Sequence, residues 1–430
     1  MTRRALALAA LMLAGLRGVA QPDSEAEPGT GEARPYVFIL AIDGLRPDVV
    51  RDEDTPHLKR LAREGAVCWR GRVSVPSQTR VNFVTIATGA HADRHGIVGS
   101  GYRDEQWVAQ RTDTPTPGEG QKHVLVPTVF EALERAGYRT AYLAMKGYEL
   151  VGARGASIQA GGKTLSPPEI WKVRYDRATE GPEEKAIENL FVLDETILSK
   201  LFEVMRSSDV HFLIANLGAT DYVGHRDGPE SPHYRRAVRE ADGRVGRFLA
   251  FLREIGILSR STVIITSDHG FTQTRLPRTL LLKGGGESGG TVPELAAAGI
   301  EHDAMSRGGR SFSLYLRDPG QAQAACEVLR RLPWVRRVYS EHKLKGLSGT
   351  LSSLRYHLPG RTGDFFVEIR PGYTLNYDNH GHHGSTERSD MEVPIILWGR
   401  GIHYGVTLKS AANVDLAPTV LALFGLDPAK

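Results

Sequence analysis

Short apolar stretches alternate with segments of helical periodicity along most of the chain. Residues 36–42 are continuously apolar, as expected of a β-strand that is buried on both faces. Further strands are predicted near residues 67–73, 140–144, 211–217, 262–266 and 393–398. This alternation predicts an α/β fold with a mainly parallel central sheet flanked by helices.

Helices are predicted between these strands from end signals and from apolar spacing. Thr55 and Pro56 begin one helix and Gly65 ends it, and residues 127–137 repeat the pattern. Residues 236–255 place apolar side chains at steps of three and four, which predicts an amphipathic helix. Asp415 is expected to cap a last helix that stops at Gly425.

Two regions do not follow this regular alternation. Residues 147–175 and 276–374 are richer in Gly and Pro and contain fewer obvious sheet strands. Within the second region, strands near residues 312–316 and 335–339 flank a predicted helix at 322–332. We therefore expect one domain over residues 35–430 with a small α+β insertion at about 276–374.

The N-terminus has the layout of a secretory signal peptide, predicted over residues 1–20. Arg3 and Arg4 precede the apolar residues 5–16, and small residues follow at 18–20. This apolar run is too short to span a bilayer core of ~30 Å. Residues 21–34 are expected to form a flexible lead-in. The protein is thus expected to be periplasmic or extracellular, without a transmembrane anchor; the alternative is an uncleaved short helix.

Composition and charge exclude several other classes. The 430 residues are 41% hydrophobic and 24% charged, which is typical of a folded enzyme-sized protein and not of a fibrous or disordered chain. The formal charge is +4, but loss of Arg3, Arg4 and Arg17 would leave 51 basic against 50 acidic residues. Binding of a nucleic acid polymer is therefore not expected. Whether Cys68 and Cys326 pair is left open by the sequence.

Four polar clusters occur where predicted strands end or are about to begin. Ligands of open α/β sheets bind beyond the carboxyl ends of the strands, so these clusters are candidates for one site. Carboxylates and imidazoles together can hold two divalent metal ions. A single such Asp is more often a helix cap, but four clusters are difficult to explain as caps. The clusters are Asp43, Asp221 with His225, Asp268 with His269, and His382 with His383.

Thr79 is the candidate nucleophile. It begins a predicted helix whose stripe includes Val81, Val84, Thr85 and Thr88. A hydroxyl at this position meets free backbone N–H groups and the positive end of the helix, which favours a bound phosphate. Metal coordination would lower the pKa of the hydroxyl and activate it. The alternative is a threonine that only caps the helix.

Several motifs in a fixed order resemble the alkaline phosphatase superfamily, and within it the type I phosphodiesterase / nucleotide pyrophosphatase branch, over nearly the whole mature chain. Each motif is weak alone, but their joint order is specific. The motifs are Ile42-Asp43-Gly44-Leu45-Arg46-Pro47-Asp48, Pro76-x-x-Thr79-x-x-Asn82, His95-Gly96-Ile97, Asp221-x-x-Gly224-His225, Ser267-Asp268-His269-Gly270 and His383-Gly384.

This resemblance implies two Zn²⁺ ions, although other divalent metals would also fit. Its first site would use Asp221, His225 and His383, and its second would use Asp43, Asp268, His269 and the Thr79 oxygen. His380 and His382 lie close enough in sequence to keep the choice of third imidazole open. Thr79 would attack phosphorus, and water would hydrolyse the phosphothreonine, with two displacements and retained configuration.

Three positions depart from the pattern of the family. Ser100 stands where diesterases usually have Asn, Arg80 follows the nucleophile where an aromatic residue is usual, and Asn216 stands where nucleotide-cleaving members commonly have Tyr. All three are candidate substrate-binding residues. The loss of two aromatic surfaces argues against committing to nucleotides. Arg80 would neutralise a second phosphate charge, unless it is simply exposed on the helix surface.

The expected function is that of an exported, metal-dependent phosphoric ester hydrolase, namely a phosphodiesterase or pyrophosphatase acting on a small phosphate ester. The alternatives are a phosphomonoesterase or phosphonate hydrolase of the same superfamily, a sulfatase, or a catalytically inactive binding relative. Gln78 stands where a sulfatase motif requires Arg, which weakens that alternative. The physiological substrate, the oligomeric state and the role of the insertion are left open.

Overall fold

A computed structural model describes residues 34–102, 121–144, 152–161, 183–274, 279–280, 283–286, 289–305, 309–375 and 379–428. The expected signal peptide and the lead-in up to residue 33 lie outside the described residues, as does most of the irregular region 147–175. Within the described part of the chain, no helix is both long enough and apolar enough to cross a membrane.

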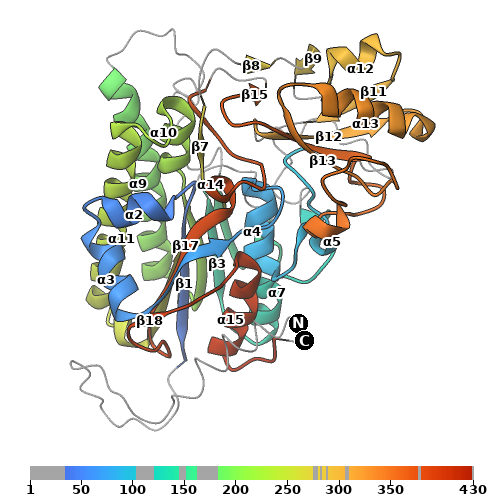
Figure 1. Cartoon of the computed structure of the whole chain (residues 1–430). Helices are drawn as coiled ribbons and strands as arrows, with labels where there is room; N and C mark the ends of the chain where they lie inside the picture. Colours follow the sequence, from blue (N-terminus) through green and yellow to red (C-terminus); the bar gives the residue numbers. More distant parts are fainter. Residues whose placement is uncertain are drawn as a thin grey trace.

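The main sheet has eight strands in the order β18-β2-β17-β6-β1-β5-β3-β4, and helices cover both of its faces (Figure 1). The strands are β1 (Tyr36–Ile42), β2 (Ala66–Arg72), β3 (Thr140–Ala144), β4 (Ile158–Gly161), β5 (Phe212–Leu217), β6 (Ser261–Thr266), β17 (Glu392–Gly399) and β18 (Val406–Thr407). The helices around it are α2 (Pro47–Asp52), α3 (Pro56–Glu64), α4 (Thr79–Thr88), α5 (Ala92–His95), α7 (Val129–Arg135), α9 (Glu183–Ser207), α10 (Ala219–Asp227), α11 (Pro232–Glu254), α14 (Arg388–Met391) and α15 (Leu416–Leu423).

The sheet is mixed but mostly parallel, which confirms the predicted fold class. Strands β6, β1, β5, β3 and β4 run parallel to one another. Strand β17 is antiparallel to both of its neighbours, β2 and β6. An apolar run predicts a buried strand but carries no information on its direction, so the sequence did not indicate this reversal.

Strand β1 lies in the middle of the sheet and shows why its sequence is apolar at every position. Phe38, Leu40 and Ile42 pack on one face with α3, α9 and α11, and the alternate residues pack on the other face with α4, α7 and α15. Each face of the strand is therefore buried by a layer of helices. The 25-residue helix α9 belongs to the first layer and was not predicted from the sequence.

The residues of the expected insertion form a second sheet with its own hydrophobic core. Its strands are β9 (Lys283–Gly286), β10 (Gly289–Thr291), β11 (His302–Met305), β12 (Ser311–Leu316), β13 (Val335–Tyr339) and β14 (Phe365–Ile369), with helices α12 (Pro293–Ala297) and α13 (Ala322–Arg331). The sheet is antiparallel, and Phe312, Leu314 and Val367 belong to the core shared with α13. This unit lies beside the carboxyl edge of the main sheet (Figure 1).

Two short two-stranded sheets lie outside the main sheet and the second sheet. The strand β16 (Gly381–His382) pairs with β7 (Thr272–Gln273), and β15 (Thr374–Leu375) pairs with β8 (Thr279–Leu280).

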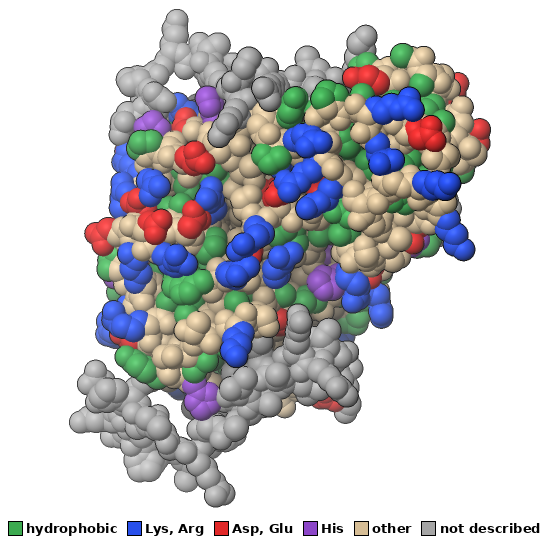
Figure 2. All heavy atoms as spheres, viewed as in Figure 1, with side chains coloured by type: hydrophobic (Ala, Val, Ile, Leu, Met, Phe, Trp, Pro, Cys, Tyr) green, Lys and Arg blue, Asp and Glu red, His purple; other side chains and the backbone are tan. Residues whose placement is uncertain are grey.

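Basic and acidic side chains are interspersed on the face of the molecule seen in Figure 2. Among the ion pairs of the described residues, Arg336 pairs with Glu387, and Arg388 Nε lies 3.1 Å from Glu392 Oε1.

Candidate active site

The polar clusters predicted from the sequence meet at one edge of the main sheet. In the parallel register, Ile42 of β1 lies opposite Leu217 of β5, and Ala41 lies opposite Thr266 of β6. The residues that follow these three strands therefore leave the sheet side by side. The loop after β16 reaches the same place, because Gly384 N–H donates to Oγ of Ser77, two residues before Thr79, at 3.0 Å. The preceding residue, His383, also forms a β-bridge with Gly309 of the insertion.

The first ligand group contains Asp221, His225 and His383. Asp221 and His225 lie on α10 four residues apart, so the helix presents both side chains on one face. His225 Nε2 lies 3.3 Å from Asp221 Oδ1, and His383 Nε2 lies 3.8 Å from the same oxygen. Each residue offers one possible ligand atom, and these three atoms all lie within 4.8 Å of one another. This spacing suits a single metal ion.

The second ligand group contains Asp43, Asp268 and His269, which are all fully buried. His269 Nε2 lies 3.3 Å from both Asp43 Oδ1 and Asp268 Oδ2. It also lies 3.8 Å from Asp221 Oδ1 of the first group, and its ring stacks on His383 with centroids 3.5 Å apart. The two groups are therefore adjacent, as a two-metal centre requires.

The three imidazoles are oriented by backbone carbonyls. In His225, His269 and His383, the Nδ1 atom lies within hydrogen-bond distance of a carbonyl oxygen, so each Nε2 is left to face the carboxylates. The carbonyls belong to Gly381, Gly270 and Ser77, at 2.9, 2.9 and 2.7 Å respectively. Such contacts set the tautomer and the ring orientation of metal-ligating histidines.

The charge of the site shifts the pKa values of two of these histidines in opposite directions. Burial alone would lower the pKa of His269, but the negative charges of Asp268, Asp43 and Asp221 raise it to about 9. Burial, together with repulsion from His269 and His225, holds the pKa of His383 well below its usual range.

The donor set fits divalent metal ions. Three carboxylates converge in a buried region, where an ionised group without compensating charge costs several kcal/mol. Each group combines carboxylate oxygens with at least one imidazole that can bind in its neutral form. Zn²⁺ and similar ions bind well to such a combination of ligands. The second group would hold one ion with Asp43, Asp268 and His269, and the first would hold the other.

Thr79 begins α4 and points at the second ligand group. Its Oγ1 lies 3.3 Å from His269 Nε2, and the residue is 5% exposed. Gln78 occupies the N-cap position, so the alternative in which Thr79 merely caps the helix is wrong. The hydroxyl therefore stands between the positive end of a ten-residue helix and the candidate metal ligands.

Two of the predicted substrate-binding residues are brought together beside Thr79. Arg80 is 6% exposed, and its Nη1 donates to the carbonyl of Ser100 at 3.0 Å. The alternative of an exposed surface arginine is therefore wrong. The Ser100 N–H in turn donates to Gln78 Oε1 at 2.9 Å, which ties the loop of residues 99–101 to the start of α4.

Asn216, the third predicted substrate-binding residue, lies behind Asp43. Its Nδ2 donates to Asp43 Oδ2 at 3.3 Å, and the residue is fully buried. This hydrogen bond restrains the Asp43 carboxylate. Asp194 of α9 acts similarly for α10, because its Oδ1 accepts hydrogen bonds from the N–H groups of Gly218 and Ala219 at 2.7 and 3.1 Å. Burial raises the pKa of Asp194 to about 6.

Sequence reasoning did not assign roles to Asp194 or Ser77. Ser77 connects the nucleophile loop to the ligand loop, since its Oγ donates to Ser385 O at 2.8 Å and accepts from Gly384 N–H. The proximity of Ser77 to Thr79 was the only available signal. The structure also selects one of the three neighbouring histidines as a candidate ligand. His383 belongs to the first ligand group. The ring of His382 instead packs over Gly309, and the backbone N–H of His380 donates to the carbonyl of His225.

Comparison with known proteins places the chain in a family. The model of the type I phosphodiesterase / nucleotide pyrophosphatase family matches residues 37–390. Human ectonucleotide pyrophosphatase/phosphodiesterase family member 7 is 26% identical over 266 residues, which are 61% of this chain and 54% of that protein. Human bis(5'-adenosyl)-triphosphatase ENPP4 is 24% identical over 422 residues, covering 92% of this chain and 79% of that protein.

The fold agrees with solved structures at lower identity. Murine ectonucleotide pyrophosphatase/phosphodiesterase 5 superimposes with a TM-score of 0.68 at 18% identity, over 91% of this chain and 95% of the other. An inactive threonine-to-alanine variant of that murine protein, in complex with AMP, gives the same score. The chain spans about half the length of the first curated relatives that it matches.

These findings confirm the resemblance seen in the sequence. The chain belongs to the type I phosphodiesterase / nucleotide pyrophosphatase family, a branch of the alkaline phosphatase superfamily and a family of hydrolases.

Proposed function

We propose that the protein is an exported, metal-dependent phosphoric ester hydrolase that cleaves phosphodiesters or pyrophosphates through a phosphothreonine at Thr79, with two Zn²⁺ ions held by the two ligand groups. The observation that carries the proposal is the position of the Thr79 hydroxyl, 3.3 Å from His269 Nε2 and beside two groups of metal-competent side chains. Export rests on the sequence of residues 1–20 alone.

The residues of the chain have separate tasks in this reaction. The N–H groups at the start of α4 and the Arg80 guanidinium attract the phosphate. Two divalent cations, when bound, supply the charge that stabilises the attacking and leaving oxygens. Thr79 Oγ1 forms a bond to phosphorus while the bond to the leaving alcohol breaks, and the alcohol departs with a proton. Water then cleaves the phosphothreonine, which restores the Thr79 hydroxyl and releases the second product.

Diester hydrolysis is supported by membership of the family and by the names of the relatives, one of which is a bis(5'-adenosyl)-triphosphatase. One feature favours the alternative of a phosphomonoesterase. Arg80 is buried next to the nucleophile, where a guanidinium would stabilise the additional negative charge of a monoester.

The test is a metal-dependence and substrate comparison on the full-length protein. Hydrolysis of bis-p-nitrophenyl phosphate, p-nitrophenyl phosphate and a dinucleoside polyphosphate would be measured before and after EDTA treatment and again after addition of zinc. We expect EDTA to abolish turnover, zinc to restore it, and the diester to be the better substrate. Full activity in metal-stripped protein would rule out the mechanism, and a strong preference for the monoester would select the alternative.

A further inference from the structure

One of the six candidate metal ligands lies on a loop, whereas the other five lie at the ends of main-sheet strands or on α10. This ligand is His383. It begins the ligand loop, residues 383–387, which runs from the two-residue strand β16 to the four-residue helix α14. A ligand on a loop is held less exactly than one on a strand or helix. The position of His383 therefore depends on contacts from elsewhere in the fold.

Two buried side chains of the insertion bind the backbone of the ligand loop. Ser311 of β12 and Glu368 of β14 lie directly opposite each other in the second sheet, so both side chains project from the same face. Ser311 Oγ donates to the Gly384 carbonyl at 2.6 Å, and Glu368 Oε1 accepts from the Thr386 N–H at 2.6 Å. Arg337 Nη1, which lies 3.5 Å from Glu368 Oε2, donates to Thr386 Oγ1 at 3.0 Å. The sheet thus holds alternate residues of the loop.

Further contacts extend to both ends of the ligand loop. At its first residue, His383 forms a β-bridge with Gly309 of the insertion. At its last residue, Glu387 forms an ion pair with Arg336 of β13. Ser77 of the nucleophile loop binds the same segment from the main domain. The ligand loop is therefore held between the insertion and the nucleophile loop.

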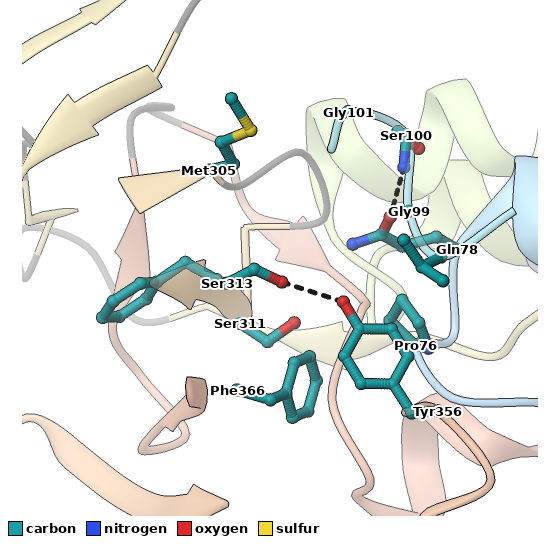
Figure 3. A pocket seen from close by; sticks show the side chains of 12 residues that line it. Pro76, Gln78, Gly99, Ser100, Gly101, Met305, Ser311, Ser313, Tyr356 and Phe366 are labelled. Atoms are coloured by element: carbon teal, nitrogen blue, oxygen red, sulfur yellow. Dashed lines mark hydrogen bonds between the residues drawn. The ribbon is translucent and has the colours of Figure 1, made fainter. Parts of the chain in front are cut away.

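Two serines of β12 distinguish contacts with the ligand loop from contacts within the insertion. Ser311 and Ser313 line a small pocket together with Pro76 and Gln78, so this face of the sheet adjoins the nucleophile loop (Figure 3). Ser313 Oγ lies 2.8 Å from Tyr356 Oη and so bonds to a residue of the insertion itself. Ser311 instead bonds to the ligand loop. The two positions therefore form a matched pair for mutation.

We propose that the insertion serves to position His383, and that Ser311 and Glu368 are positioning residues for the metal ion of the first ligand group. The inference rests on the proposed function and gives a role to the insertion, which the sequence left open. A ligand that is already held in place loses less conformational freedom when the ion binds, so the ion is bound more tightly. The second ligand group contains no residue of the ligand loop, and its ion should depend less on these contacts.

The test measures zinc affinity of the full-length protein by competition with a chelator. The wild type is expected to bind two ions. Ser311→Ala and Glu368→Leu should each bind one ion with the wild-type affinity and the other at least roughly 10-fold more weakly. Glu368→Gln keeps an oxygen that accepts the Thr386 N–H and should recover most of this affinity. The control Ser313→Ala loses a buried hydrogen bond of the same sheet face but should bind both ions as the wild type does.

Turnover at controlled free zinc gives a second readout. In Ser311→Ala and Glu368→Leu, the zinc concentration for half-maximal hydrolysis of bis-p-nitrophenyl phosphate should rise by the same factor as the binding constant. Excess zinc should then restore turnover, which it would not do if the substitutions had merely unfolded part of the protein.

The outcomes separate this inference from the proposed function. Wild-type affinity for both ions in Ser311→Ala and Glu368→Leu would overturn the inference and leave the proposed function standing. Equal weakening of both ions, or the same loss in Ser313→Ala, would also overturn it, because the effect would then be a general destabilisation. If Glu368→Leu does not fold, Ser311→Ala alone decides. Failure of the wild type to bind zinc or to hydrolyse the diester would remove the proposed function and this inference together.

Discussion

Removal of the metal ions should reveal a specific pH dependence of stability that originates at His269. In the metal-free protein this buried imidazole faces Asp43, Asp221 and Asp268, and it is held in its protonated form. The carboxylates raise its pKa to about 9, compared with 6.5 for an ordinary histidine. A metal ion at the second ligand group would take the place of this proton, because a histidine ligand must be neutral.

The sign and size of the effect follow from this difference. A group whose pKa is higher in the folded state stabilises the fold fully below its unfolded pKa, and the contribution is lost as the pH rises through its folded pKa. The window therefore runs from 6.5 to about 9. A shift of this size at ~1.4 kcal/mol per unit corresponds to a loss of about 3 kcal/mol of unfolding free energy from low to high pH. In the metal-loaded protein, His269 carries no proton to lose, and its contribution to the slope should vanish.

The assay is urea unfolding of EDTA-treated protein across this pH window. Other groups also titrate, so the informative quantity is the difference between the wild type and Asp268→Asn, which removes the strongest charge that raises the pKa of His269. The variant should lose less stability as the pH rises. Glu203→Gln, which removes an exposed carboxylate paired with Lys200, should behave as the wild type. Equal pH dependence in wild type and Asp268→Asn would refute the reasoning.

Three further predictions test the surroundings of the site. Asn216→Ala removes the hydrogen bond to Asp43 and should weaken metal binding by roughly 10–100-fold in chelator competition, as loss of similar supporting contacts does; unchanged affinity would argue against a positioning role. Gly270→Ala would place a Cβ 2.1 Å from a backbone oxygen, and the resulting overpacking should lower the unfolding free energy by about 1–3 kcal/mol in thermal denaturation. Cys68 and Cys326 are buried free thiols, so both should react with iodoacetamide in urea without reductant, and a resistant pair would contradict the structure.

The positions of the ligands could be predicted because the chemistry is attached to regular elements. The apolar run at residues 36–42 predicts a central strand, and the parallel arrangement brings Asp43 and Asp268 to the same edge. Asp221 and His225 are four residues apart, which places both on one helix face. Strand ends and helix spacing thus indicated that these four side chains meet, whereas the choice of His383 over His380 and His382 required the structure.

Features that depend on contacts between distant segments could not be predicted in the same way. The direction of β17 follows from its pairing with β2 and β6, and apolar character alone does not determine it. The contact of Arg80 with the carbonyl of Ser100 depends on a loop twenty residues away. A small pocket lies between Gln78 and the insertion strands β11, β12 and β14 (Figure 3). It depends on the approach of these strands to α4, for which the sequence contains no local signal.

The central claim is that Thr79 is the nucleophile of a two-metal hydrolase, and the most direct test is turnover of Thr79→Ala measured together with its zinc content. The side chains of the two ligand groups remain in this variant. We predict that Thr79→Ala binds zinc with a stoichiometry close to that of the wild type and has no measurable hydrolysis of bis-p-nitrophenyl phosphate. Hydrolysis at the wild-type rate by the zinc-loaded variant would contradict the account.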